Sequence, residues 1–217
     1  MRPRLLIIIF LLSIKGFSQG DSVAFSRDFT LFEGMYLTYL DFRHNWPIPK
    51  EKIVTDISKD QLDFYSKLME MDKIVFTERD GNKDTVLSVR VWGYCQNNVI
   101  YININKSFFR IPVFGAISFF VATVDVNNYS PGYNVFANGN IPSGGVRGTV
   151  KELREFLLNF YSGELIVFSL EKVEEFLKPD AAVYNEFMTL NKKKKKDLAT
   201  KYIRMYNEKH PVYFPKN

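Results

Sequence analysis

The sequence predicts an α+β fold in which an antiparallel β-meander of about five strands lies between N-terminal helices and a C-terminal helical layer. Residues 73–125 are rich in β-branched and aromatic side chains and carry turn signals at 80–82 and 97–98. On both sides of this region, helix-start motifs precede apolar residues at helical spacing. With 217 residues, 46% of them hydrophobic, the chain is large enough for one domain with its own core and too apolar for a disordered protein.

Residues 1–18 form a predicted signal peptide, cleaved between Ser18 and Gln19. They combine a positive start, a short apolar stretch and two small residues, namely Arg2, Arg4, residues 5–14, Gly16 and Ser18. A stretch of this length is too short to span a bilayer, which takes about 20 residues. We therefore expect an exported chain, periplasmic or secreted, whose residues 19–217 form one α+β domain without a transmembrane span. The alternatives are an N-terminal anchor or a buried strand.

Cleavage also removes most of the apparent basic character. The full sequence has 29 Lys and Arg residues against 24 acidic ones, a net charge of +5. Loss of Arg2, Arg4 and Lys15 lowers the net charge to +2, and five of the remaining basic residues form one run at 192–196. The basic excess is therefore local, which together with the export signal argues against nucleic acid as a partner.

The N-terminal part, residues 19–72, is predicted to hold two helices that begin with capping boxes. The boxes are Thr38 with Asp41, before a helix over 39–45, and Ser58 with Gln61, before a helix that ends at Met71. A brief strand is predicted over 53–55.

The meander occupies residues 73–125. Its strands are predicted over 73–77, 85–94, 99–104, 107–111 and 116–124. The run 112–124 is almost wholly apolar but too short for a transmembrane helix, and its Ile, Phe and Val residues favour a strand buried on both faces.

Residues 126–148 are predicted to form a loop rich in Gly and Asn. Loops of this length are often functional or disordered. The end of this loop carries a candidate anion-binding group, Gly144, Gly145 and Arg147, since free backbone N–H groups and a guanidinium attract anions before a helix. The pattern lacks the ending of a P-loop. A purely structural loop is the alternative.

The C-terminal part, residues 149–217, is predicted to be mainly helical. Thr149 with Glu152 resembles a third capping box, which predicts a helix with four apolar residues on one face: Leu153, Phe156, Leu157 and Phe160. A single strand is predicted over 164–168. Three further helices are predicted to begin at Ser169, at 179–180 and at Asn191.

The last of these helices begins with a candidate surface-binding run: Lys192, Lys193, Lys194, Lys195 and Lys196. Anionic lipid or polysaccharide is a fitting partner for such a run. The alternative is a solvated helix face. Five consecutive positions point around most of a helix, so we expect some of these lysines to lie over the apolar stripe and to extend their ammonium groups toward solvent.

We predict no catalytic, cofactor-binding or metal-binding residue. The chain has two histidines, His44 and His210, too few for a histidine-rich zinc site, and it has no hydrolase or metalloprotease motif. A glycosidase that uses two carboxylates needs no such motif, so the sequence neither supports nor dismisses it. The single cysteine, Cys95, is predicted to be a buried thiol, with an intermolecular disulfide as the alternative.

Four aromatic residues have two interpretations, packing in the core or stacking on sugars: Trp46, Trp92, Tyr94 and Tyr101. Core packing is the favoured interpretation.

Three segments, residues 36–45, 92–97 and 202–211, together resemble uncharacterised secreted proteins of gram-negative gut and environmental bacteria. The resemblance implies export and assigns no site. In such bacteria, Asp-Ser/Thr-aliphatic triplets can be O-glycosylated, and residues 21–23 and 84–86 fit that pattern.

These observations favour an exported protein that works without catalysis, by binding an envelope protein or a glycan. One alternative is a glycan- or peptide-acting hydrolase with carboxylate chemistry. Another is peripheral association with a membrane surface through residues 192–196. No cofactor is expected.

Export generates the first testable prediction. When the full chain is expressed in a gram-negative host, mass spectrometry of its N-terminus should find Gln19 as the first residue, in the periplasmic or secreted fraction. Cytosolic protein that still begins at Met1 would contradict this expectation.

Overall fold

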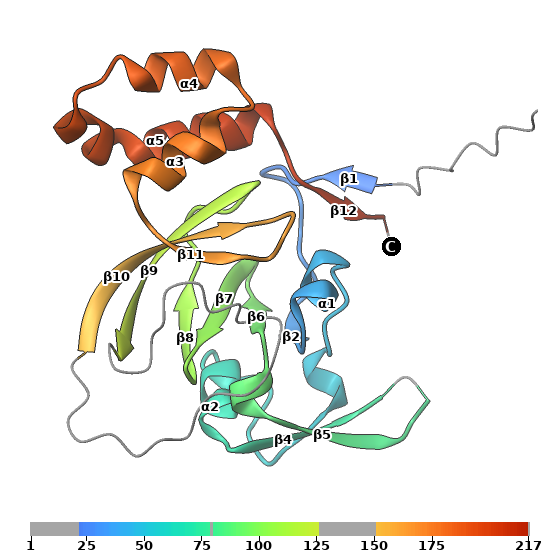
Figure 1. The fold of residues 1–217 in the computed structure, drawn as a ribbon. Helices are drawn as coiled ribbons and strands as arrows, with labels where there is room; N and C mark the ends of the chain where they lie inside the picture. Colours follow the sequence, from blue (N-terminus) through green and yellow to red (C-terminus); the bar gives the residue numbers. More distant parts are fainter. Residues whose placement is uncertain (1–21, 79, 126–150, 217) are drawn as a thin grey trace, which may run out of the picture.

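The computed structural model of the chain describes residues 22–78, 80–125 and 151–216. Within these ranges, twelve strands form antiparallel sheets beside five α-helices, which confirms the predicted α+β class (Figure 1). Three of the helices form a layer at the C-terminal end of the fold, as expected. No helix in the described ranges is long and apolar enough to cross a membrane.

The first predicted helix is confirmed. It is α1 (Tyr39–Arg43), which follows β2 (Gly34–Tyr36) and begins with the expected capping box. The Thr38 hydroxyl accepts from the Asp41 backbone N–H at 3.1 Å, and the Asp41 carboxylate accepts from the Thr38 N–H at 2.8 Å. Both donors would otherwise be unsatisfied at a helix start, so these two residues fix where α1 begins.

The second predicted helix begins later than expected. A 3₁₀ turn (Lys50–Lys52) and β3 (Ile53–Val54) lead into turns, and α2 (Phe64–Glu70) starts only after Asp63. The predicted capping box of Ser58 and Gln61 is therefore wrong. The Gln61 side chain instead accepts from Lys67 Nζ at 2.7 Å, and so it does not cap the backbone at Ser58.

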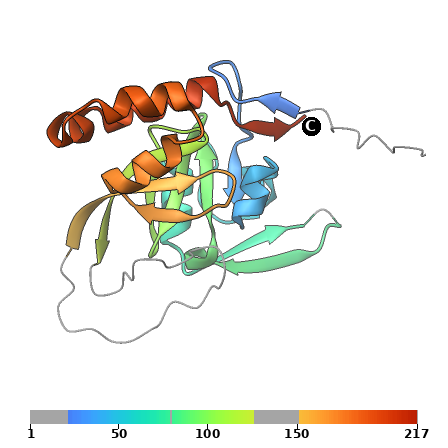
Figure 2. The same cartoon turned by 45° about the horizontal axis from the view of Figure 1, so that its top comes forward.

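The strands of residues 73–125 are antiparallel neighbours distributed over three sheets. A hairpin projects from the body of the fold and pairs with β3 (Figures 1 and 2), and a four-stranded sheet contains β2. Their further strands are β4 (Lys73–Thr77) and β5 (Lys83–Leu87) in the hairpin, β6 (Gly93–Gln96), β7 (Val99–Ile104) and β8 (Ser107–Arg110) in the sheet, and β9 (Ile117–Asp125) in a third sheet.

The strand predicted over 85–94 is divided by a 3₁₀ turn, Ser88–Arg90, at which the chain passes from one sheet to the next. The buried amide of Asn103 holds this turn. Its Nδ2 lies 2.8 Å from the carbonyl oxygen of Val91 and 3.2 Å from that of Ser88. A side chain 12 or more residues away thus donates to two carbonyls of this turn, of which that of Ser88 also accepts from the Val91 N–H at 3.1 Å.

The helix predicted from Thr149 is wrong, because residues 151–159 form a strand, β10 (Lys151–Asn159). It pairs with β9 over nine positions and with β11 (Leu165–Val167) on its other side. Three consecutive side chains of β10 are fully buried, Phe156, Leu157 and Leu158. A central strand buries both faces, whereas an amphipathic helix buries one, so pairing overrides the helix propensity of this segment.

The C-terminal helices follow the predicted starts. They are α3 (Leu170–Leu177), α4 (Ala181–Met188) and α5 (Lys192–Lys209), capped by the side chains of Ser169, Asp180 and Asn191. The Asn207 amide joins α5 to the sheet, since Oδ1 accepts from the Ile117 N–H at 3.0 Å and Nδ2 donates to the Ile117 carbonyl at 2.7 Å. Asn207 thereby acts as an extra strand residue at the start of β9.

Asp180 links two parts of the helical layer. Its carboxylate accepts from the Val183 backbone N–H, lies 3.0 Å from His210 Nε2 and lies 3.5 Å from Lys209 Nζ. These partners, the Val183 N–H first, lower the pKa of Asp180 from its ordinary 3.8 to about 2.

The largest core cluster is aromatic and centres on Phe42, whose side chain is fully buried. Its ring stacks on Trp92 at a centroid distance of 4.5 Å and meets Tyr36 edge-on at 5.3 Å. It also contacts Phe214 of β12 (Tyr213–Pro215), the strand that pairs with β1 (Ser22–Ala24) (Figure 1). One ring therefore joins α1, the four-stranded sheet and the pair formed near the two chain ends.

We predict that Phe42→Ala lowers the free energy of unfolding by about 3–5 kcal/mol, because it removes a buried ring from a close-packed cluster. Leu40→Ala on the same helix is the matched control, since Leu40 is 58% exposed and should cost less than about 1 kcal/mol. Urea unfolding of both variants measures the difference, and equal losses would contradict the central place of Phe42.

A third prediction concerns how the stability of the fold depends on pH. Because the folded pKa of Asp180 lies below its ordinary value, its charge stabilises the fold above about pH 4, and this contribution fades as the pH falls toward 2. Asp180→Asn keeps a capping oxygen but loses the charge. The melting temperature of this variant should lie below that of the parent at neutral pH and converge with it between about pH 4 and 2. A gap that stays constant across this range would contradict the prediction.

Candidate functional site

The lysine run has a partly structural role. Lys195 is buried, its Nζ donates to Glu174 of α3 at 2.7 Å, and it lies 5.5 Å from the ring centre of Phe187. The pKa of the Glu171 carboxyl is lowered first by hydrogen bonds from the Glu171 backbone N–H and from Ser169. The nearby charge of Lys192 lowers it further. The run therefore interacts with the acidic residues of α3.

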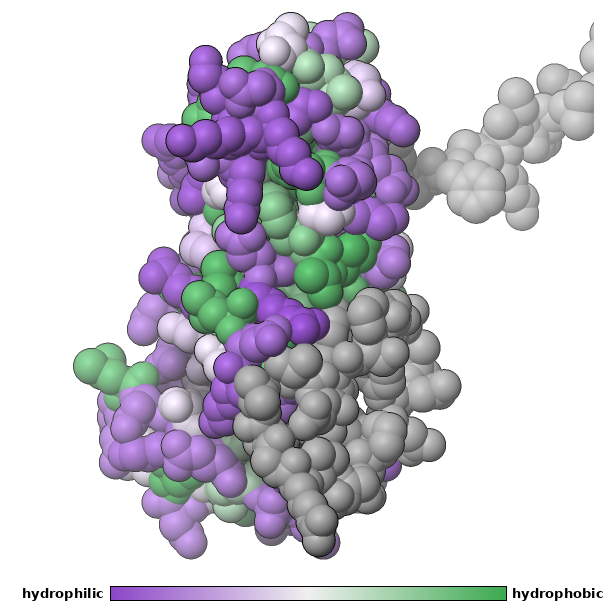
Figure 3. Space-filling model, turned by 60° about the vertical axis from the view of Figure 1, so that its left-hand side comes forward, coloured by the Kyte–Doolittle hydropathy of each residue, from purple (hydrophilic) through white to green (hydrophobic). Residues whose placement is uncertain are grey.

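The other lysines remain at the surface. Lys193, Lys194 and Lys196 are exposed, as is Lys192, and Figure 3 shows hydrophilic side chains gathered over the helical layer. Lys195 meets the expectation that part of the run lies over the apolar stripe. It does not meet the expectation that the ammonium group then extends toward solvent, because its Nζ is paired with Glu174.

Several predicted positions lie outside the described residues. They are Ser18 and Gln19 of the cleavage site, Gly144, Gly145 and Arg147 of the candidate anion site, and the surrounding loop. Within the described chain, Ser22 and Thr85 of the two glycosylation triplets are exposed on β1 and β5. Their modification stays a prediction.

Cys95 is fully buried, as predicted, and burial together with the nearby charge of Glu33 raises the pKa of its thiol to about 12. A thiol with this pKa is protonated at neutral pH and is a poor nucleophile. Among the described residues, no cluster of three or more His, Cys, Asp or Glu side chains is arranged to hold a metal ion.

Of the four aromatic residues, Trp92 and Tyr94 are buried and Tyr101 is partly buried, which agrees with core packing. Trp46 is 48% exposed and stacks on His44 at a centroid distance of 4.9 Å. It is the most exposed of the four.

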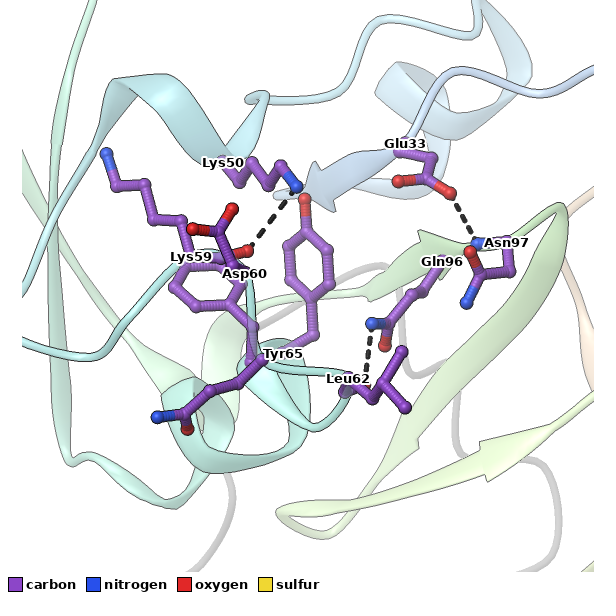
Figure 4. A pocket seen from close by; sticks show the side chains of 10 residues that line it. Glu33, Lys50, Lys59, Asp60, Leu62, Tyr65, Gln96 and Asn97 are labelled. Carbon is purple, nitrogen blue, oxygen red and sulfur yellow. Dashed lines mark hydrogen bonds between the residues drawn. The ribbon is translucent and has the colours of Figure 1, made fainter.

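A polar pocket that sequence reasoning missed lies in the N-terminal half of the fold (Figure 4). It has a volume of about 100 Å³ and lies where the 3₁₀ turn Lys50–Lys52, the turns before α2 and the β6–β7 turn meet. Its lining is mostly polar and contains two carboxylates, two lysines, three amides and three apolar or aromatic residues: Glu33, Asp60, Lys50, Lys59, Gln61, Gln96, Asn97, Leu62, Phe64 and Tyr65.

Tyr65 carries the unusual feature of this pocket. Its side chain is 1% exposed, and its hydroxyl has no hydrogen-bond partner among the described residues. A buried hydroxyl without a partner costs about 1–3 kcal/mol. Burial, with the charges of Glu33 and Glu51, raises the pKa of Tyr65, so the hydroxyl keeps its proton and is available as a donor.

A stack of aromatic rings fixes the position of this hydroxyl. Tyr65 stacks on Tyr94 at a centroid distance of 5.2 Å, and Tyr94 stacks on Tyr101 at 4.7 Å. Phe64 meets Tyr65 edge-on at 5.0 Å. Because the ring is held on more than one side, its hydroxyl cannot turn away to find a partner elsewhere.

The polar walls are also held in place. Glu33 Oε1 accepts from the Asn97 N–H at 2.6 Å, and Gln96 Nε2 donates to the Leu62 carbonyl at 2.7 Å (Figure 4). Lys50 Nζ donates to the Lys59 carbonyl at 3.4 Å. Each of these side chains keeps further hydrogen-bonding capacity after its one bond to the protein.

The turn between β6 and β7 presents Asn97 to the pocket. Asn97 and Asn98 both have positive φ, 51° and 58°, as the predicted two-residue hairpin turn requires. The Asn98 side chain also accepts from the Leu31 N–H at 2.9 Å, which ties the turn to the segment that leads to Glu33. The turn signal was visible in the sequence, but its neighbours in the pocket were not.

A matched pair of variants tests the unsatisfied hydroxyl. Tyr65→Phe should leave the free energy of unfolding unchanged or raise it by up to about 1 kcal/mol, because it removes a buried polar group without a partner. Tyr36→Phe should lower it by about 1 kcal/mol, since the Tyr36 hydroxyl lies 2.8 Å from the Phe32 carbonyl and 3.0 Å from Asn45 Oδ1. Urea unfolding distinguishes the two, and an equal loss in both variants would show that the Tyr65 hydroxyl is satisfied.

No family model, curated protein or solved structure matches this chain. The resemblance to secreted bacterial proteins therefore stays a prediction. The function must be inferred from the geometry and chemistry of the chain's own residues.

Proposed function

We propose that this chain is an exported protein that binds a small polar ligand, or the polar end of a larger one, in the pocket around Tyr65. The observation that carries the proposal is the buried Tyr65 hydroxyl, which has no hydrogen-bond partner among the described residues and belongs to a side chain that lines this pocket. A bound ligand that accepts from this hydroxyl would remove the cost of leaving it unpaired.

The rigidity of the site supports the same proposal. The ring of Tyr65 is fixed by stacking, and Glu33 and Gln96 are each held by a bond to the backbone. A ligand then meets polar groups that are already ordered, so little side-chain entropy is lost when it binds.

The export of the chain is proposed on its N-terminal sequence. Outside the cytoplasm, a binding protein of this kind meets envelope proteins and glycans, the partners that the sequence favours.

Hydrolysis of a glycan or peptide by two carboxyl groups is the second candidate, because Glu33 and Asp60 line the same pocket. Such a reaction places one carboxyl as an acid and the other as a base or nucleophile on either side of the scissile bond. Peripheral membrane binding is a third candidate, and it rests on the exposed lysines of the run alone.

The proposed function predicts where ligands bind. In NMR titrations of ¹⁵N-labelled protein with sugars, amino acids and small dicarboxylates, at least one compound should shift the backbone amides of Leu62, Gln96 and Asn97. Lys50→Glu should change this binding, because it reverses a charge at the pocket. Lys193→Glu on the exposed helical face is the matched control and should leave it unchanged.

Other results would overturn this assignment. Shifts confined to other parts of the chain, or none with any compound, would exclude the pocket as the binding site. Hydrolysis of a bound sugar or peptide that is lost in Glu33→Gln would favour the second candidate. Salt-sensitive sedimentation with anionic vesicles, weakened by Lys193→Glu and not by Lys50→Glu, would favour the third.

A further inference from the structure

We infer that the Tyr65 pocket takes a neutral polyhydroxylated group, such as one sugar ring of a glycan. This inference rests on the proposed function, since it names the class of ligand for the same pocket. Three properties of the pocket carry it: the balance of its charges, the mixture of its donors and acceptors, and its size.

The charges of the lining cancel. Two carboxylates, Glu33 and Asp60, stand against two ammonium groups, Lys50 and Lys59. A ligand with a net charge would meet like charges inside a partly enclosed site, where water screens them less than at an open surface. A ligand without net charge avoids this repulsion.

The charges are also interleaved. Asp60 follows Lys59 in the chain, and Figure 4 shows the Tyr65 hydroxyl between Lys50 and Glu33. A zwitterion such as a free amino acid needs a positive end and a negative end in the site, because its two charged groups are separated. In Figure 4 Asp60 lies beside Lys50 and Lys59, so its carboxylate offsets the positive charge on the side of the pocket opposite Glu33, which favours a neutral ligand over a zwitterion.

Donors and acceptors lie close together in the pocket. The Tyr65 hydroxyl donates, the carboxylate oxygen of Glu33 that Asn97 does not use accepts, and Lys50 keeps two of its three donors. A ligand hydroxyl both donates and accepts, so a single hydroxyl can satisfy two of these groups at once. A ligand with several neighbouring hydroxyls fits the whole lining.

The volume sets the size of the bound group. A cavity of about 100 Å³ has room for several water molecules. A ligand that displaces ordered water must reproduce its hydrogen bonds, or affinity is lost. Hydroxyl groups resemble water most closely in this respect. The room suffices for part or all of one small ring, so a longer glycan would present one unit to the pocket and leave the rest outside.

The test uses matched probes that differ in charge. The protein is titrated by NMR with a panel of neutral pentoses, hexoses and N-acetylhexosamines, with glucuronate, with glucosamine and with glycine. At least one neutral sugar should shift the amides of Leu62, Gln96 and Asn97 and bind about tenfold or more tightly than any charged or zwitterionic probe. Tyr65→Phe should weaken this binding by about three- to tenfold, through loss of one hydrogen bond. Tyr161→Phe is the control, because Tyr161 is 58% exposed and lies outside the pocket.

Two variants test the charge argument separately. Glu33→Gln removes a negative charge and should narrow the difference between glucuronate and the neutral sugar. Lys50→Met removes a positive charge and should do the same for glucosamine. A folding defect would weaken the binding of every probe. It would not improve the relative affinity for glucuronate in one variant and for glucosamine in the other.

The outcomes separate this inference from the proposed function. Tighter binding of glucuronate, glucosamine or glycine at the same amides would overturn the neutral-sugar inference and leave the pocket as the binding site. The absence of shifts at these amides with every probe would overturn both.

Discussion

The stacking of Trp92 against Phe42 holds the aromatic core together. The same stacking positions the candidate site, because the segment that carries Trp92 continues into the site. Trp92 belongs to the aromatic cluster that joins α1 to the sheet and to the last strand. Tyr94, two residues on, belongs to the neighbouring cluster and stacks on Tyr65. Between them, Gly93 has no space for a side chain, since a Cβ there would collide with the Tyr101 carbonyl oxygen. The position of the Tyr65 hydroxyl is therefore a consequence of how the core is packed.

Local signals allowed most of the fold to be predicted from the sequence. Helix starts at Thr38, Ser169 and Asn191 were predictable because a cap involves residues only a few positions apart. The strand Lys151–Asn159 was not, because its helix-forming residues are paired with β9, more than 25 residues earlier, and strand pairing is non-local. The pocket was not predictable for the same reason, since its lining is drawn from residues between 33 and 97, and no short motif connects them.

Opposite charges lie close together in two places in this fold, the helical layer and the pocket. In the helical layer, Lys195 is paired with Glu174, and Asp180 lies between Lys209 and His210. In the pocket, two lysines face two carboxylates. The basic excess of the sequence thus predicts neither site. The fold, and not the total charge, decides which opposite charges come together, and in the pocket they line the proposed ligand site.

The two most buried tyrosines of the N-terminal half differ in how their hydroxyl groups are satisfied. The Tyr36 hydroxyl is satisfied by Asn45, a residue with positive φ that also accepts from the Phe32 N–H, so the surrounding backbone is built around it. The Tyr65 hydroxyl is equally buried, but residues 22–78, 80–125 and 151–216 supply no acceptor for it, and phenylalanine would pack as well. Polar groups that break the rule of satisfied burial concentrate at sites whose partner is not part of the chain. A tyrosine kept at this cost, in the lining of a polar pocket, supports the proposal of a ligand that completes its hydrogen bonding.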